Sequence, residues 1–412
     1  MRILWLCNIV LPELSEEFGF KKVQAGGWLS GMWEQLKKKK ELELAVCVPV
    51  RDKNRMKDGE YYGYRYYSFQ TIKKEEEIAN GQCRFQEIVC DFRPDVVHIW
   101  GTEYLHSYAM LQACEEQGML EHVLVHIQGL VSVYALHYRF GLPESVVKDS
   151  QYGCSIDDEI QDFIWRGQFE KKLLQKVFYV AGRTDWDRAC CKQINPKINY
   201  YHCGEILRDI FYQSSVKWTV ECCEKYSIFI SQAGYPVKGF HLALDVLAEL
   251  AKKYPKLHVY ISGTDIGHIE STYGRYIQKK IEEYQLGEKL TFVGTLSPEE
   301  MEKYYRKANV FLSASVIENS SNSVCEAMHV GTPVVSSFVG GISSIITHGE
   351  SGFLYPLDAG YMMQYYISQI FEEDSLAEQI AEKERERAAE YNHRDSIVEK
   401  IIEIYQIVKD GL

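Results

Sequence analysis

The sequence contains no apolar run near the ~20 residues that a membrane-spanning helix needs. Its first residues, MRILWLCNIVLPE, are apolar only briefly and offer no small-residue cleavage site. We therefore expect a buried first strand rather than a signal peptide. Positive charge is also scarce, because the formal charge of the 412 residues is −12. This balance argues against broad binding of nucleic acid.

No two cysteines are separated by a two-residue gap, although the chain has twelve of them. Adjacent pairs occur at Cys190/Cys191 and Cys222/Cys223, and the others are scattered. This spacing excludes the usual zinc patterns and does not suggest a disulfide framework. We expect reduced thiols in a cytoplasmic protein, with no bound metal.

The sequence shows no short-period repeat and no low-complexity linker, and it is too long for one hydrophobic core. Strand-like and helix-like segments alternate, and this alternation restarts near residue 226. We predict an α/β protein with two Rossmann-like domains, at residues 1–210 and 222–391. The amphipathic helix at 392–412 is expected to pack back on the first domain. The predicted strands are 2–7, 42–50, 93–101, 122–129, 176–182, 226–234, 257–263, 290–296 and 308–315.

Tyrosine is abundant, with 29 residues and a cluster YYGYRYYSF at 61–69. Such rings suit a surface that handles sugars, and they equally suit a half-buried strand with aromatic cross-strand pairs. The strand is the favoured interpretation. The Gly-x-Gly-x-x-Gly pattern is absent, so a nicotinamide dinucleotide is a poor fit.

The stretch ENSSNSVCEAMHVGTPVV at 318–335 places two glutamates eight positions apart. Glu318 falls in a loop after a predicted strand, and Glu326 falls in the first turns of a helix that Gly331 ends. Free N–H groups at such a helix start suit phosphate oxygens, and a carboxylate there can accept bonds from ribose hydroxyls. The alternative is that both acids only stabilise the helix dipole.

Two further features point to an anion. Lys238 follows a strand and opens a helix, where its ammonium group can reach a diphosphate; the alternative is a solvated lysine. Gly26 and Gly27 open a helix after the first strand of the other domain, where glycine permits close backbone approach.

The motifs AGGW, SQAGYPVKGF, ISGTD, FVGTLS and ENSSNSVCEAMHVGTPVVSSFVGGISSII occur in this order, with HIWGTE and VAGRTDWDRA between the first two. Together they resemble glycosyltransferase family 4. The resemblance implies a GT-B architecture, in which two Rossmann-like domains have parallel sheets facing across a cleft. It also implies a retaining, metal-independent enzyme whose first domain binds the acceptor and whose second binds the donor.

The resemblance assigns roles to matching positions. Glu318, Lys238 and His126 would be catalytic, with Glu318 facing the donor sugar, Lys238 stabilising the leaving diphosphate and His126 lying near the donor sugar. Glu326 would hold the donor ribose. The other expected donor-binding residues are Gly26, Gly27, Gly239, Gly294, Thr295, Leu296, Asn322 and Ser323. Many members carry an arginine about five residues before the lysine, which is missing here; Arg183 and Arg208 are candidate substitutes.

The implied partners are a nucleoside-diphosphate sugar and a glycan or lipid-linked acceptor, as in the synthesis of bacterial polysaccharides. No cofactor is expected. The lysine run 37–40 either complements the end of a helix dipole, which is favoured, or touches the inner face of the cytoplasmic membrane peripherally. Two other functions stay open: a nucleotide-sugar epimerase on a related fold, and a non-catalytic subunit that binds a sugar nucleotide.

Overall fold

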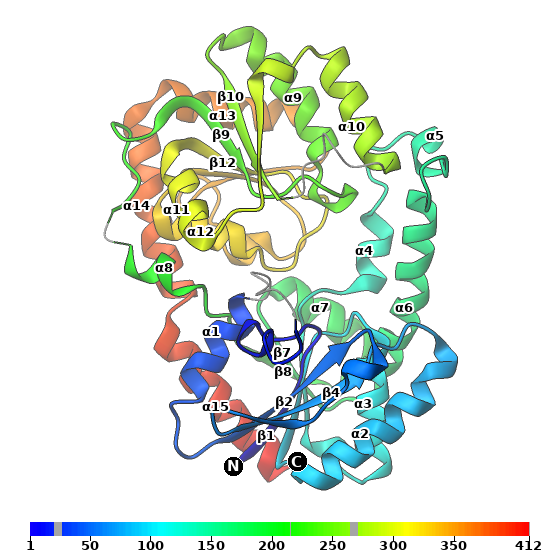
Figure 1. The fold of residues 1–412 in the computed structure, drawn as a ribbon. Coiled ribbons are helices and arrows are strands. Elements are labelled where there is room, and N and C mark those ends of the chain that lie inside the picture. Colours follow the sequence, from blue (N-terminus) through cyan, green and yellow to red (C-terminus); the bar gives the residue numbers. More distant parts are fainter. Residues whose placement is uncertain (20–26, 215, 264–270, 412) are drawn as a thin grey trace. The chain divides into compact units, whose positions relative to one another are not determined.

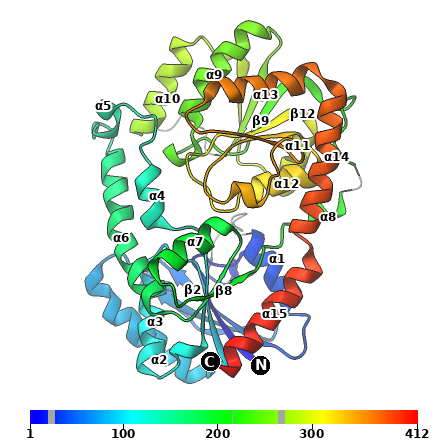
Figure 2. The same cartoon turned by 180° about the vertical axis from the view of Figure 1, so that it is seen from behind.

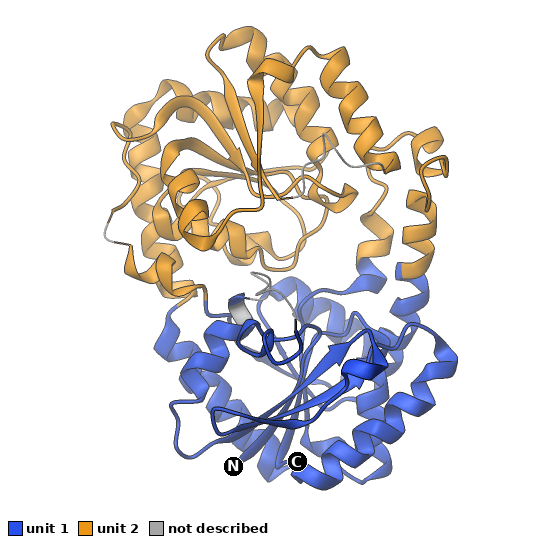
Figure 3. Ribbon diagram, in the orientation of Figure 1, with its two compact units in different colours: residues 1–133, 163–206, 393–412 blue, residues 134–162, 207–392 orange. Residues whose placement is uncertain are grey.

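The computed structural model describes residues 1–19, 27–214, 216–263 and 271–411 (Figures 1 and 2). The chain forms two compact units (Figure 3). Unit 1 consists of residues 1–133, 163–206 and 393–412, and unit 2 consists of residues 134–162 and 207–392. The division differs from the expected boundaries at residues 134–162, which belong to unit 2 rather than to the first domain.

Within the described residues, unit 1 contains an eight-stranded sheet with the order β3-β4-β2-β1-β5-β6-β7-β8. Every neighbouring pair is parallel except β3 and β4, which form an antiparallel hairpin. All five residues of β5 are buried, as expected for a central parallel strand covered on both faces. The strands are β1 (Arg2–Leu6), β2 (Glu43–Val50), β3 (Gly59–Tyr61), β4 (Tyr64–Gln70), β5 (Val96–Trp100), β6 (Val123–His126), β7 (Tyr179–Gly182) and β8 (Asn199–His202).

Helices cover both faces of this sheet. Helix α15 (Arg394–Asp410) packs on α1 (Gly27–Leu36) and on β5 and β6. Its Tyr405 hydroxyl accepts a hydrogen bond from Trp5 Nε1 at 2.9 Å, deep in the core. Helix α1 ends at Leu36, so the lysine run follows the helix end. The other helices with residues in unit 1 are α2 (Ile78–Phe92), α3 (Leu105–Glu116), α4 (Val131–His137), α6 (Ile156–Lys176) and α7 (Asp185–Ile194).

Unit 2 contains, within its described part, a six-stranded parallel sheet with the order β11-β10-β9-β12-β13-β14. The first strand in sequence, β9, lies in the middle of the sheet. The next two strands, β10 and β11, are added on one side of it, and β12, β13 and β14 are then added on the other side. This order creates a topological switch point between β9 and β12, where ligands bind in such folds. The strands are β9 (Glu224–Ile230), β10 (His258–Ser262), β11 (Leu290–Gly294), β12 (Ala308–Ser313), β13 (Val334–Ser337) and β14 (Phe353–Tyr355).

The helices of unit 2 follow from that order, because right-handed crossovers in opposite directions place helices on opposite faces. Helices α9, α10 and α13 pack as neighbours, and α11, α12 and α14 pack together (Figures 1 and 2). The helices are α5 (Glu144–Val147), α8 (Asp209–Gln213), α9 (Phe240–Lys253), α10 (Thr272–Glu283), α11 (Pro298–Lys307), α12 (Asn322–Val330), α13 (Gly360–Glu372) and α14 (Asp374–Tyr391).

Residues 134–162 pack on α9 and α10 through specific polar contacts. His241 Nε2 lies 2.8 Å from the carbonyl oxygen of Phe140, and the Thr272 hydroxyl donates to the carbonyl oxygen of Asp149 at 3.0 Å. These contacts explain why the segment belongs to unit 2, although its sequence neighbours on both sides belong to unit 1.

No helix in the described ranges is long and apolar enough to cross a membrane. The two-unit α/β architecture with parallel sheets is confirmed. All twelve cysteines are free thiols in the structure.

Candidate functional site

Two loops of unit 2 meet where the neighbouring strands β9 and β12 end. After β9 the chain makes a short 3-10 turn, Pro236–Lys238, and after β12 it runs through residues 314–321 into α12. The backbone N–H of Val316 donates to the carbonyl oxygen of Val237 at 2.8 Å, which ties the loops together. Since β9 and β12 are parallel, both loops leave the carboxyl edge of the sheet.

Two glycines allow the loops to approach this closely. Gly239 has φ +64°, and a Cβ there would overlap with the carbonyl oxygen of Ala314. Gly340, in the loop after β13, has φ +50°, and a Cβ there would overlap with the carbonyl oxygen of Glu318. The neighbouring Gly341 N–H donates to that same oxygen at 3.0 Å. The position of Glu318 is thus fixed by loops from three successive strands of the sheet.

Lys238 and Glu318 form an ion pair at this junction, with 2.8 Å between Nζ and Oε2. The Ser315 hydroxyl also donates to this carboxylate oxygen at 3.3 Å. Both side chains are partly buried, with 22% of Lys238 and 14% of Glu318 exposed, so a ligand can reach them. Burial disfavours the charged form of Lys238, but the Glu318 carboxylate outweighs burial and raises the pKa of Lys238. The lysine is therefore a permanent cation at neutral pH.

Helix α12 begins beside this pair. Its N-cap residue is Ser321, whose hydroxyl lies 3.0 Å from the Ser323 hydroxyl and, in the described structure, does not cap the first turn. Asn322 Oδ1 is buried and has no hydrogen-bond partner among the described residues. The helix start therefore keeps backbone donors and one side-chain acceptor for a ligand.

Glu326 lies one turn further along α12 and is almost fully buried. One carboxylate oxygen accepts hydrogen bonds from Arg208 Nε at 3.1 Å and Nη2 at 2.7 Å. The other oxygen accepts from the Tyr305 hydroxyl at 3.1 Å. Burial raises the pKa of Glu326, and Arg208 opposes that rise. Each carboxylate oxygen has more than one lone pair, so Glu326 keeps capacity to accept from a ligand.

Gly294, Thr295 and Leu296 follow β11, at the outer strand of the same sheet. Gly294 ends the strand with φ +71°. The next residue, Ser297, caps α11 by reciprocal bonds: its hydroxyl accepts from the Glu300 N–H at 3.2 Å, and the Glu300 carboxylate accepts from the Ser297 N–H at 2.7 Å. The three residues therefore lie between a strand end and a firmly capped helix.

The remaining predicted residues belong to unit 1. His126 is the last residue of β6 and is fully buried, stacked on Trp100 with ring centroids 4.5 Å apart. Burial lowers its pKa to about 3, so the ring is neutral at neutral pH. Gly27 is the first residue of α1, and Gly26 lies outside the described residues. Their roles at a donor site remain predictions.

The two candidate replacements for the missing arginine are in different surroundings. Arg183 is buried in unit 1 and paired with Glu205. Arg208 lies in unit 2 on Glu326. Sequence reasoning could not place Arg208, because it is 118 positions from its partner. Tyr305 was missed altogether, since a lone tyrosine in a helix carries no signal for a bond to a distant carboxylate.

Comparison with known families gives a match within unit 2. Residues 221–387 match the model of the family "Glycosyl transferases group 1". This range lies inside unit 2 and contains Lys238, Glu318 and Glu326. The matched part is therefore similar to glycosyltransferase domains, which agrees with the expected transferase activity.

A curated relative and two solved structures give the same picture. The chain is 30% identical over 124 residues to mannosylfructose-phosphate synthase of Agrobacterium fabrum, covering 29% of this chain and 27% of that protein. In fold it is similar to sucrose-phosphate synthase from Thermosynechococcus elongatus, with TM-score 0.75, 17% identity and 98% of both chains covered. It is also similar to Anabaena HepE in complex with UDP-glucose, with TM-score 0.69, 14% identity and coverage of 98% and 99%.

These comparisons show the fold of nearly the whole chain, but they give sequence similarity to glycosyltransferases over only part of it. The solved structures are similar over nearly the whole chain, and the fold is GT-B, as expected. The sequence matches to curated relatives cover less than half of their length. They show relatedness to glycosyltransferases, while the assignment to family 4 rests on the motifs alone.

Proposed function

We propose that the protein is a retaining glycosyltransferase of family 4. It moves a sugar from a nucleoside-diphosphate sugar to a hydroxyl group of a glycan, a lipid-linked or another acceptor. The observation that carries this proposal is the Lys238–Glu318 pair, 2.8 Å apart at the switch point of a group 1 glycosyltransferase domain. A cation, a carboxylate and a helix start meet there, and a diphosphate-linked sugar needs each of them.

The charges act on opposite ends of the breaking bond. Departure of a nucleoside diphosphate places negative charge on the phosphate oxygens and positive oxocarbenium character on the sugar. Lys238 and the N–H groups that begin α12 stabilise the negative end, and Glu318 faces the sugar end. Such fixed charges help the transition state more than the ground state, because the charge separation grows along the reaction. In this proposal these protein groups stabilise the transition state without a metal ion.

Glu326 holds the ribose of the donor in this proposal. Its carboxylate accepts from the two ribose hydroxyls, while Arg208 and Tyr305 keep it oriented from the opposite side. Asn322 and Ser323 at the start of α12, and the loop from Gly294 to Leu296, complete the donor contacts. Many family members carry an arginine about five residues before the lysine, and this chain has none there. In this proposal Arg208 supplies that positive charge instead.

The proposed setting is the cytoplasm, with a bacterial polysaccharide or another surface glycan as the product. A nucleotide-sugar donor is supported by Anabaena HepE, a structure of similar fold in complex with UDP-glucose. The acceptor is proposed to bind to unit 1.

A thermal-shift panel tests donor binding directly. The full-length protein is heated with UDP, GDP, ADP, TDP and their sugar derivatives, all in EDTA. One nucleotide should raise the melting temperature, because a ligand that binds only the folded protein adds RT ln(1 + [L]/Kd) to its stability. Lys238→Ala should reduce the shift, while Lys252→Ala, an exposed lysine of the same unit, should preserve it. The proposal fails if no nucleotide stabilises the protein, or if the two variants behave alike.

A further inference from the structure

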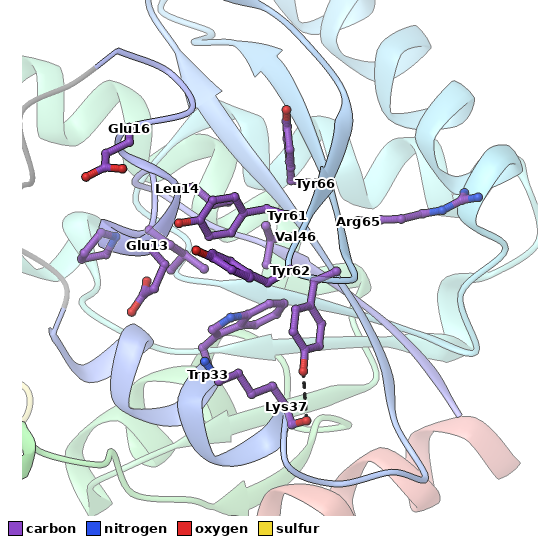
Figure 4. A pocket seen from close by; sticks show the side chains of 13 residues that line it. Glu13, Leu14, Glu16, Trp33, Lys37, Val46, Tyr61, Tyr62, Arg65 and Tyr66 are labelled. Carbon is purple, nitrogen blue, oxygen red and sulfur yellow. Dashed lines mark hydrogen bonds between the residues drawn. The ribbon is translucent and has the colours of Figure 1, made fainter.

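A hollow of about 280 Å³ lies entirely in unit 1, between the 3-10 turn at Pro12–Leu14, helix α1 and the β3–β4 hairpin (Figure 4). Its walls are unusually rich in aromatic side chains for so small a space. The rings that line it are Trp33, Tyr61, Tyr62, Tyr64 and Tyr66. The hairpin is the tyrosine cluster of the sequence, so the predicted strand is present and one of its ends also lines a cavity.

Tyr62, which lines this hollow, has an unfavourable backbone conformation. It forms the two-residue hairpin turn with Gly63, and the two residues have φ +48° and +80°. Turns of this kind favour asparagine or glycine, and a bulky side chain there is strained. Yet Tyr62 is 85% exposed, and its ring lies edge-on to that of Tyr61, with centroids 4.5 Å apart. Packing within the chain therefore does not explain the residue, and strain of this kind is typical of binding sites.

Two acidic side chains, Glu13 and Glu16, line the hollow. The Ser30 hydroxyl donates to Glu13 at 3.2 Å, but neither acid forms an ion pair with any residue in the described ranges. The two basic residues of the lining are already neutralised elsewhere, Lys37 by Glu34 and Arg65 by Asp91.

Figure 4 shows how these groups are directed. The hydroxyl ends of Tyr61 and Tyr62 point to the side where Glu13 and Glu16 lie, and the Arg65 guanidinium points away. The pKa of Tyr61 is raised, mainly by burial. The charges of neighbouring acids, including Glu16 and Glu13, add to this rise, as expected where the potential is negative.

Beside the hollow, the ammonium group of Lys57 already lies between aromatic rings and a carboxylate. Lys57 Nζ lies 5.5 Å from the ring centroid of Phe18 and 6.0 Å from that of Tyr66, which also lines the hollow. The Glu17 carboxylate completes this arrangement at 2.9 Å. The chain thus satisfies one acid of the 13–17 segment with its own cation and leaves two acids facing the hollow.

We propose that this hollow binds a small organic ammonium group, held by the faces of Tyr61, Tyr62 and Trp33 and neutralised by Glu13 and Glu16. Aromatic faces attract ammonium groups because the ring quadrupole is negative above the ring plane. A neutral sugar would use the rings but would gain nothing from the negative charge of Glu13 and Glu16, whereas an ammonium group is attracted by it. Two sources share this chemistry, an amino sugar and a choline-type head group. The proposal does not depend on sugar transfer, because the hollow lies in unit 1 and its test measures binding alone.

Isothermal titration of the full-length protein with charged ligands and their neutral isosteres tests the proposal. The pairs are choline with 3,3-dimethylbutan-1-ol, and glucosamine with glucose. The charged member of at least one pair should bind about tenfold or more tightly than its neutral partner, and added salt should weaken it. Whichever pair shows the difference identifies the source. Equal affinities within both pairs, or no binding of any compound, would overturn the proposal.

Variants locate the binding to the hollow. Glu13→Gln and Tyr62→Ala should each weaken the charged ligand about tenfold. Tyr62→Phe keeps the ring face and should retain binding. Tyr361→Ala removes a similarly exposed tyrosine (74%, against 85% for Tyr62) from unit 2 and serves as the control. Because Tyr62 is exposed, its variants should fold, which circular dichroism verifies. Unchanged affinity in both Glu13→Gln and Tyr62→Ala would show that the ligand binds elsewhere.

Discussion

At the scale of single residues, the proposed chemistry depends most on Lys238. Replacing it with alanine removes the cation that we propose to face the leaving diphosphate and leaves Glu318 without this ion-pair partner. Loss of one such preorganised group costs roughly 10²–10³-fold in rate. We therefore expect Lys238→Ala to lower kcat/KM for the nucleotide sugar by about that factor, measured as donor consumption.

Lys252→Ala controls for the loss of a lysine in the same unit, because Lys252 is exposed and paired only with its helix neighbour Glu249. Its kcat/KM should equal that of the wild type. A Lys238→Ala enzyme within twofold of the wild type would remove Lys238 from the mechanism.

Glu326 has a structural role that can be separated from ribose binding. Glu326→Ala leaves the Arg208 guanidinium and the Tyr305 hydroxyl without their acceptor. A polar group stranded in the interior costs about 1–3 kcal/mol, so the free energy of unfolding should fall by that amount. Urea denaturation measures the loss. The double variant with Arg208→Ala should lose less than the sum of the two single variants, because the contact they share is lost only once. Strict additivity would contradict the pairing.

At the scale of elements, the close approach of loops is the feature that forms the site. Gly239→Ala should displace the loop after β12 and so reduce both stability and donor binding, because its Cβ would overlap with the Ala314 carbonyl oxygen. Gly349→Ala is the matched control, since Gly349 also has a positive φ of +79° but has open space around it. It should show only the left-handed backbone cost of about 1–2 kcal/mol and normal nucleotide binding. Equal thermal shifts with nucleotide in both variants would contradict this account.

The attachment of residues 134–162 to α9 should depend on pH. Burial lowers the pKa of His241 to about 4, and its ring contacts the Phe140 carbonyl oxygen and the Tyr273 hydroxyl. The unfolded chain, with its ordinary value near 6.5, takes up this proton first, so stability is lost as the pH falls from 6.5 toward 4. The loss from this one group is about 2 kcal/mol at pH 5.

Urea denaturation at pH 7 and pH 5 measures this effect. His241→Gln should lose less stability between the two pH values than the wild type, by about 2 kcal/mol. Tyr273→Phe keeps the titrating ring and should retain the pH dependence. A His241→Gln protein with the wild-type pH dependence would show that this histidine does not contribute.

The elements that sequence predicted well are those with strong local signals. The buried strands β1, β5, β6 and β12 are apolar runs bounded by turn residues. The hairpin β3–β4 was anticipated only as a half-buried strand, because its second role as a cavity wall depends on the 3-10 turn at Pro12–Leu14 and on α1, which are distant in sequence. The membership of residues 134–162 in unit 2 was missed for the same reason: it depends on contacts about 100 positions away.

At the scale of the whole molecule, the sequence matches a known family in unit 2 but not in unit 1. The family match is confined to unit 2, where the proposed donor-binding residues follow strand ends. Unit 1 shares the fold with solved structures but lies outside that match. The motifs of unit 2 therefore suffice to propose a class of donor, whereas no short pattern in unit 1 specifies an acceptor.

Proton NMR of donor hydrolysis in EDTA tests the central claim most directly, because water replaces the unidentified acceptor. The donor is the α-linked nucleotide sugar that gives the largest thermal shift. We predict slow release of the α-anomer of the free sugar, before mutarotation, with no added metal and with much slower release by Lys238→Ala. Initial release of the β-anomer, loss of turnover in EDTA, or equal rates for the two proteins would contradict transfer with retention by protein charges.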